Sequence, residues 1–182
     1  MRKFILSVVL FSASLVASAQ QHPLWMRYPA ISPDGTTIAF AYKGDIYSVP
    51  VGGGEARQLT TNAAFDSHPV WSPDSKKIAF ASDREGSIDV FVIDAKGGTP
   101  TRLTTNSGTE TPIVFTDNDH VLFSSSLMPT AQSIIFGSGT FPQIYKVSTK
   151  GGRPELYSTL TMEDISIAND GTVLYQDKKG YE

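Results

Sequence analysis

The sequence contains no cysteine among its 182 residues. This absence excludes disulfide bonds, thiolate metal ligands, a cysteine nucleophile and a cysteine-linked lipid anchor. Charged residues are also few, at 18%, and the formal net charge is -3. Nucleic acid is therefore not an expected partner, because it requires a basic surface. Hydrophobic residues make up 40% of the chain, as is typical of a folded domain rather than a disordered tail.

The longest apolar run lies at the amino terminus and is too short to span a membrane. Two basic residues precede thirteen mostly apolar ones at 4–16, and residues 17–19 read Ala-Ser-Ala. A membrane-spanning helix needs about 20 apolar residues. This pattern predicts a secretory signal peptide over residues 1–19 that is cleaved after Ala19. The mature chain is expected to be periplasmic or secreted, with no membrane span after cleavage.

A twelve-residue segment recurs along the chain, and this repeat predicts the fold. Residues 29–40, PAISPDGTTIAF, return forty residues later as PVWSPDSKKIAF, with nine of twelve positions identical or both apolar. Weaker copies begin at residues 112 and 165, and a Gly-Gly pair follows the next strand pattern in the first three units. A repeat of about forty residues with four strand patterns and a glycine turn is typical of a β-propeller blade.

We therefore expect an all-β chain that forms a partial β-propeller of four-stranded blades, about three and a half in number. The expected divisions are a lead-in segment at 20–28 and a propeller region at 29–182, with blade 1 at 29–60, blade 2 at 69–104, blade 3 at 112–157 and the start of blade 4 at 165–182. A β-sandwich is the alternative, but it has no reason to repeat Ser-Pro-Asp at matching offsets. Because closed propellers have about four to eight blades, the chain is expected to be the amino-terminal part of a longer protein.

The unit at 69–104 resembles the WD40-like blades of TolB-type propellers, through Trp-Ser-Pro-Asp, Ser-Asp-Arg, Asp-Val-Phe-Val-Ile, Gly-Gly and Arg-Leu-Thr. The lead-in from His22, which reads HPLWMRY and enters a first blade directly, is similar to the start of periplasmic tricorn-type serine peptidases. This resemblance covers about 20–180. It implies a second propeller, a PDZ domain and a protease core elsewhere in the protein, which acts on peptides or proteins. That family's catalytic residues lie beyond this sequence.

The sequence carries no pattern expected of a catalytic, cofactor or metal site. Gly-x-Ser-x-Gly, the turn that presents a hydrolase nucleophile, does not occur. The three histidines, His22, His68 and His120, are in separate units and do not form a helical pair for metal binding. The run from Asp117 to Asp119 lacks the glycine and distal glutamate of a calcium loop. We therefore expect no catalytic residue, cofactor or metal ligand in this chain.

Two acidic residues at matching positions of the repeat form the first candidate for a functional surface. Asp66 and Glu110 lie forty-four residues apart in the loops expected between units, and His68 is close to Asp66. Such loops lead from the outer edge of one blade to the inner strand of the next. These three residues are therefore expected at one rim of the channel, facing a peptide. The alternative is that the acids are ordinary solvated loop carboxylates, which is the common case.

An apolar insertion in the third unit is the second candidate. It spans residues 124–142 and joins two expected strands with about ten residues more than the second unit uses. A loop this apolar is usually packed against something. It either folds back on its own blade or contacts another domain or a second copy of the chain. The residues concerned are Leu127, Met128, Ile134, Ile135, Phe136 and Phe141.

Three functions follow from these patterns. The first is the non-catalytic propeller region of a secreted tricorn-like serine endopeptidase, which gates or delivers peptides to a catalytic core outside this chain. The second is a TolB-type propeller that acts as a protein-binding scaffold in the cell envelope. The third is a relative of the prolyl oligopeptidases. The partners expected in the first case are a peptide or protein substrate, the remaining domains of the same chain and a further copy in a homo-oligomer.

Overall fold

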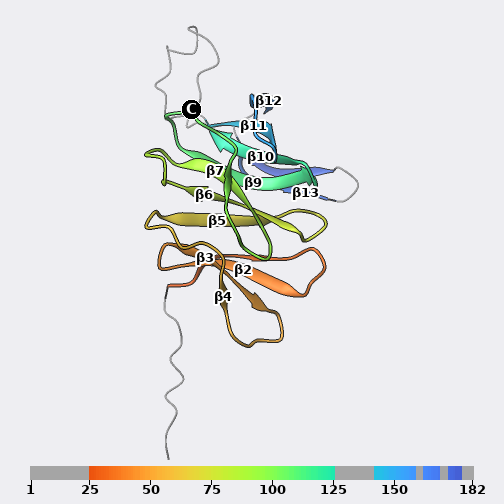
Figure 1. Cartoon of the computed structure of the whole chain (residues 1–182). Helices are drawn as coiled ribbons and strands as arrows, with labels where there is room; N and C mark the ends of the chain where they lie inside the picture. Colours follow the sequence, from red (N-terminus) through yellow and green to blue (C-terminus); the bar gives the residue numbers. More distant parts are fainter. Residues whose placement is uncertain (1–24, 126–141, 159–161, 169–171, 178–182) are drawn as a thin grey trace, which may run out of the picture.

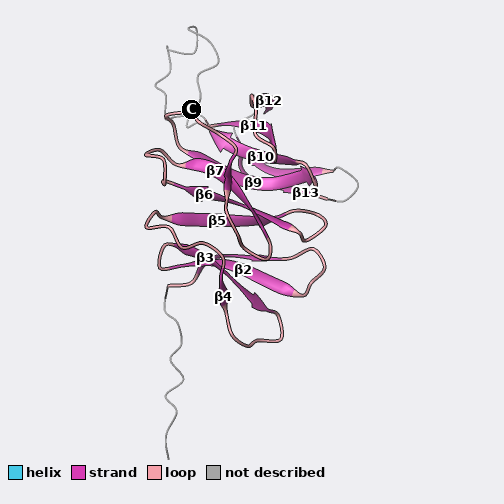
Figure 2. Ribbon diagram, viewed as in Figure 1, coloured by secondary structure: helices cyan, strands magenta, loops and turns pink. Residues whose placement is uncertain are grey.

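A computed structural model shows an all-β chain, as the ribbon in Figure 2 makes clear. It describes residues 25–125, 142–158, 162–168 and 172–177. Across these ranges there is no helix of the length and apolarity that a bilayer crossing requires. The predicted signal peptide at 1–19 lies outside the described residues.

The strands form three antiparallel sheets of four strands each and a strand pair that follows them. In each sheet the strands are hydrogen-bonded in chain order, so each repeat unit forms one blade. Blade 1 holds β1 (Arg27–Ile31), β2 (Thr37–Tyr42), β3 (Asp45–Pro50) and β4 (Arg57–Gln58). Blade 2 holds β5 (Asp66–Trp71), β6 (Lys77–Ser82), β7 (Asp89–Asp94) and β8 (Thr101–Arg102). Blade 3 holds β9 (Glu110–Asp117), β10 (His120–Ser125), β11 (Gln143–Ser148) and β12 (Glu155–Ser158), and β13 (Met162–Ile167) pairs with β14 (Val173–Asp177).

The blades stack face to face in chain order, from blade 1 at the bottom of Figure 1 to blade 3 near the top. The first strand of each unit contacts the first strand of the next, since β5 packs against β1 and β9, and β13 packs against β9. These first strands are therefore the inner strands around the propeller axis. The prediction of a partial all-β propeller with four-stranded blades is confirmed.

Apolar residues on both faces of the middle strands build the core between blades. Ile46 of β3 packs in one cluster with Phe80 of β6 and Phe91 of β7, all of them buried. Ala79, on the same strand as Phe80, belongs to the next cluster with Phe123 of β10. The small alanines between large residues allow neighbouring sheets to approach closely, as packed sheets do.

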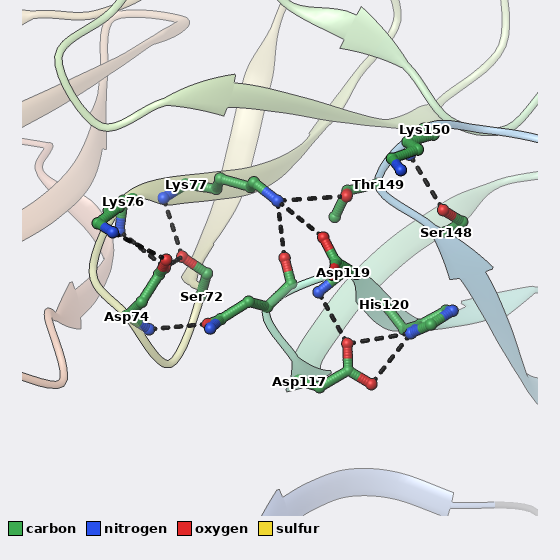
Figure 3. A network of polar contacts seen from close by, with 11 residues as sticks. Ser72, Asp74, Lys76, Lys77, Asp117, Asp119, His120, Ser148, Thr149 and Lys150 are labelled. Atoms are coloured by element: carbon green, nitrogen blue, oxygen red, sulfur yellow. Dashed lines mark hydrogen bonds and ion pairs between the residues drawn. The ribbon is translucent and has the colours of Figure 1, made fainter.

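Polar turns join neighbouring blades at the ends of β1, β5 and β9. The Ser72 hydroxyl donates to Asp74 at 2.7 Å, and the backbone amide of Asp74 donates to Asn118 of the next blade at 3.0 Å (Figure 3). Lys77 reaches the same turn, where it donates to the Asn118 carbonyl at 2.8 Å and to Asp119 at 3.3 Å. The residues with calcium-loop character, Asp117 to Asp119, therefore serve as a hairpin turn and a blade contact.

The inner strands begin two or three residues before the predicted unit boundaries. They start at Arg27, Asp66, Glu110 and Met162, whereas the repeat predicted starts at 29, 69, 112 and 165. The residues of the expected inter-unit loops nearest each strand are therefore part of the strand. This difference changes the surroundings of the candidate residues described next.

Candidate functional site

The starts of the inner strands lie beside the turns between the second and third strands of the preceding blade. The backbone amide of Asp66 donates to the Gly44 carbonyl at 2.8 Å, and that of Glu110 donates to the Ile88 carbonyl at 2.8 Å. We use the name rim for these neighbouring segments. The rim comprises residues 25–28, 42–45, 63–68, 83–89 and 106–110.

Asp66 is buried in the rim and is neutralised by an arginine. Its side chain has no exposed surface, and Arg84 donates to its two carboxylate oxygens at 3.0 and 2.9 Å. The guanidinium also lies 4.6 Å from the ring centroid of Phe91. Two bonds to one carboxylate and an aromatic face hold Arg84 in place. Asp66 thus stabilises the rim from within and does not face the solvent.

Glu110 is equally buried at the start of β9. Asn106 donates to its Oε1 at 2.8 Å, and its exposed fraction is 0%. Burial raises the pKa of Glu110, and the nearby charge of Asp89 raises it further. The expectation that Asp66 and Glu110 are exposed loop acids is therefore wrong, because both begin strands whose ends are covered by the preceding blade.

His68 and Tyr28 occupy equivalent positions on neighbouring inner strands, forty residues apart. Each lies where the strand pairing shifts register, and each has a positive φ, 52° for His68 and 53° for Tyr28. Their rings contact each other with centroids 3.8 Å apart. Burial lowers the pKa of His68, so the neutral ring is favoured. Positive φ at an aromatic residue is uncommon and marks a strained position in the rim.

A hollow of about 530 Å³ lies in the rim next to this pair. Trp25, Arg27 and Tyr28 line it from the start of blade 1, and Lys43 and Phe65 line it from the loops beside them. Two cations lie over aromatic rings, with Arg27 5.4 Å from Trp25 and Lys43 5.3 Å from the ring of Tyr42. The hollow therefore presents aromatic and cationic groups to a ligand.

Of the three predicted rim residues, His68 is the one that is partly exposed, and its ring contacts Tyr28, which lines this hollow. Sequence reasoning did not identify Trp25, Arg27 or Lys43. The position of Lys43 in its turn is unusual. Lys43 precedes Gly44 in a two-residue turn in which both residues have positive φ, 52° and 91°. Such turns favour Asn or Gly at the first position, so a lysine there is unexpected on conformational grounds. The candidate docking residues from Leu127 to Phe141 lie outside the described residues.

The rim offers groups that are suited to binding. Within the described ranges, no three His, Asp or Glu residues gather in a way that would hold a metal ion. The aromatic faces of Trp25 and Phe65 and the charges of Arg27 and Lys43 are suited to holding a flexible chain.

Solved structures of other β-propellers superpose on this fold. The putative TolB from Agrobacterium tumefaciens superposes with a TM-score of 0.62 at 23% identity, over 76% of this chain and 50% of that one. The tricorn protease superposes with a TM-score of 0.50 at 16% identity, over 68% of this chain and 13% of that one. At these identities the likeness is one of fold alone.

Sequence comparison then identifies the family. The model of the tricorn protease N-terminal β-propeller domain matches residues 23–182, and the chain belongs to this family. The tricorn protease homolog 1 of Streptomyces coelicolor is 35% identical over 82 residues, which are 45% of this chain and 8% of that protein. The chain thus spans a small part of the length of this relative. The resemblance inferred from the blade motifs and the lead-in segment is confirmed.

Proposed function

We propose that this chain is the non-catalytic propeller region of a periplasmic or secreted tricorn-like serine endopeptidase, where it gates or delivers peptides to a catalytic core elsewhere in the protein. The family match over residues 23–182 carries the proposal. The predicted signal peptide at 1–19 supports the location. The expected partners are a peptide or protein substrate, the remaining domains of the same protein and a second copy of the chain.

The rim supports a role in handling peptides. The side chains of peptides vary, so a surface that guides many peptides needs contacts that do not depend on one sequence. Aromatic faces and long cationic side chains provide such contacts, and Trp25, Arg27, Lys43 and Phe65 present them around one hollow. We assign the guiding contacts to this hollow and to His68. The buried side chains of Asp66 and Glu110 stabilise the same rim.

An activity assay on the full-length protein tests this function. The full-length protein is expected to degrade casein, and a serine-directed covalent inhibitor should stop the reaction. Residues 20–182 alone should be inactive on the same substrate. Cleavage by residues 20–182 would contradict the non-catalytic assignment, and an inactive full-length protein would contradict the peptidase assignment.

A TolB-type scaffold is the second candidate, and the TM-score of 0.62 against the TolB structure favours it. A scaffold binds a protein partner without cleaving it. The casein assay separates the two functions, because a scaffold leaves casein intact in every form of the protein.

We further propose that the third-unit insertion, from Leu127 to Phe141, contacts another domain or subunit. Its apolar sequence supports this assignment. Deletion of residues 128–139 from the full-length protein should lower its oligomeric mass by light scattering. An unchanged mass with altered thermal stability would instead indicate a loop that packs on its own blade.

A further inference from the structure

Two neighbouring blade junctions hold buried acids at equivalent positions but differ in their cations. At the junction of blades 1 and 2, Asp66 receives both hydrogen bonds from Arg84. At the junction of blades 2 and 3, the equivalent acid Glu110 forms no ion pair with an arginine of the described residues. Among these residues, the bond that neutralises charge at this junction runs from Arg102 to Asp89 Oδ2, at 2.7 Å.

The sequence of blade 3 does not provide a replacement for Arg84. Arg84 follows β6, and the matching stretch after β10 is residues 126–141. This stretch contains no Lys, Arg or His and no acidic residue. Among the described residues, the two buried carboxyl groups of Asp89 and Glu110 therefore have one cation beside them, Arg102, and it bonds to Asp89.

Three buried oxygens at this junction have no donor. They are Asp89 Oδ1, Glu110 Oε2 and Ser125 Oγ, on β7, β9 and β10. Ser125 is 1% exposed and is the register partner of Glu110, so their side chains lie on the same face of the blade. Asp89 and Glu110 are also within hydrogen-bonding reach of each other. A second negative charge in this position is costly, because a buried carboxylate needs a compensating partner.

We propose that this junction binds one proton, carried by Glu110 and donated to Asp89, so that a carboxylic acid–carboxylate hydrogen bond joins blades 2 and 3. Burial raises the pKa of Asp89 as well, but Arg102 donates to Asp89 and lowers it, so Glu110 is the protonated member. Asn106 donates to Glu110 Oε1, and the Thr104 hydroxyl also contacts this carboxyl group, which leaves Oε2 to carry the proton. Ser125 Oγ lies on the same face of the blade.

A metal ion fits this junction less well. Calcium takes six to eight oxygen ligands, and three free oxygens are far short of that number. The guanidinium of Arg102, bonded to one of the same carboxylates, also repels a second cation. Of the other charged groups on the packed strands, Asp66 is paired with Arg84, Lys77 bonds to Asp119 at the opposite end of β6, Lys146 is paired with Glu155, and Asp94 lies at the far end of β7 from Asp89. His68, on β5, is held neutral by burial.

The bound proton makes the junction sensitive to pH. Because burial and the Asp89 charge raise the pKa of Glu110, the folded protein keeps a proton that the unfolded chain releases. The stabilisation of the fold by protonated Glu110 is complete below the ordinary pKa of glutamate, 4.5. It is lost as the pH rises through the raised pKa of Glu110 in the folded protein. The local unfolding constant of the junction should rise by up to about tenfold per pH unit within that window.

Hydrogen exchange in the full-length protein tests the proposal, with one substitution at each of the two junctions. The amides of Leu103 and Glu110 report on blades 2 and 3, and those of Leu59 and Asp66 on blades 1 and 2. Glu110→Gln mimics the protonated acid, since its amide donates to Asp89. It should preserve protection at pH 8 and remove its dependence on pH. Asp66→Asn, the matched control, should lose protection at every pH because Arg84 loses its partner.

The opposite results would overturn the proposal. If Glu110→Gln loses protection as Asp66→Asn does, the ionised form of Glu110 is the one that the fold requires. If sodium or calcium at constant ionic strength raises protection in the unmodified protein but not in Glu110→Gln, a metal ion occupies the junction. An infrared band of a protonated carboxyl group at neutral pH, absent from Glu110→Gln, supports the bound proton directly, and its absence from both proteins contradicts it.

Discussion

At the scale of single residues, threonine hydroxyls complete the backbone hydrogen bonding where blades 1 and 2 end. The amide of Ile46 donates to Thr60 Oγ1, and the amide of Val90 donates to Thr104 Oγ1, both at 2.9 Å. These contacts repeat with the same offset as the blades. They are buried, so water cannot replace the hydroxyl.

Thr104→Val should therefore reduce the free energy of unfolding by about 1–3 kcal/mol, because it leaves the amide of Val90 without an acceptor. The side chain keeps its shape, so packing is little changed. Thr101→Val, at an exposed position of the same blade, is the control and should change stability by less than about 0.5 kcal/mol. Urea denaturation measures both. Equal effects would show that the buried hydroxyl has no special role.

A second residue-scale prediction concerns His68. Burial lowers its pKa below that of the unfolded chain, so the neutral ring stabilises the fold above about pH 6.5 and this stability is lost as the pH falls. His68→Asn removes the titration and tolerates the positive φ. The melting temperature of the unmodified protein should drop more between pH 7.5 and 5.5 than that of the variant. A parallel drop in both would contradict this role.

At the scale of elements, the hairpin turns and strands were largely predictable from the repeat. Continuous apolar runs and Ser-Pro-Asp turns located the middle strands, because both patterns depend on neighbours in sequence. The starts of β5 and β9 were not predictable, because Asp66 and Glu110 look like loop acids in sequence. Their strand position depends on Arg84, Asn106 and the preceding blade. The hollow was missed for the same reason, since Trp25, Lys43 and Phe65 meet only in the folded chain.

The turn between β1 and β2 offers an element-scale test. Gly35 has φ of 71°, and a Cβ added there would meet nothing within 4 Å. Gly35→Ala should thus cost about 1 kcal/mol through backbone strain alone. Gly52→Ala is the matched control, since Gly52 is also in open space but not in the left-handed region. It should be neutral or slightly stabilising. Similar losses in thermal unfolding for both variants would contradict the assignment to strain.

At the scale of the whole molecule, blade 1 leaves an apolar groove on its outer face. This groove of about 600 Å³ is lined by aliphatic and aromatic side chains, among them Ile38, Phe40, Tyr47 and Val49. Blade faces of this kind are covered by the next blade elsewhere in the structure. An uncovered face favours association between copies.

Residues 20–182 expressed alone should accordingly be oligomeric or poorly soluble. Sedimentation velocity on the purified chain measures this. The expected result is a distribution of species larger than the monomer. A monomeric species that unfolds in one cooperative transition would show that the exposed apolar face of blade 1 does not cause association between copies.

Whether the rim guides peptides to a distant catalytic core can be measured by blocking the hollow through a single thiol. This chain has no cysteine, so Ala63→Cys at the hollow and Glu55→Cys on the outer edge of blade 1 each add one thiol to it. Each is introduced into the full-length protein with other cysteines replaced, then coupled to a bulky polymer. If the rim guides peptides, the polymer at position 63 should slow peptide cleavage several-fold, while the polymer at position 55 should not. Equal rates for the two coupled proteins would contradict it.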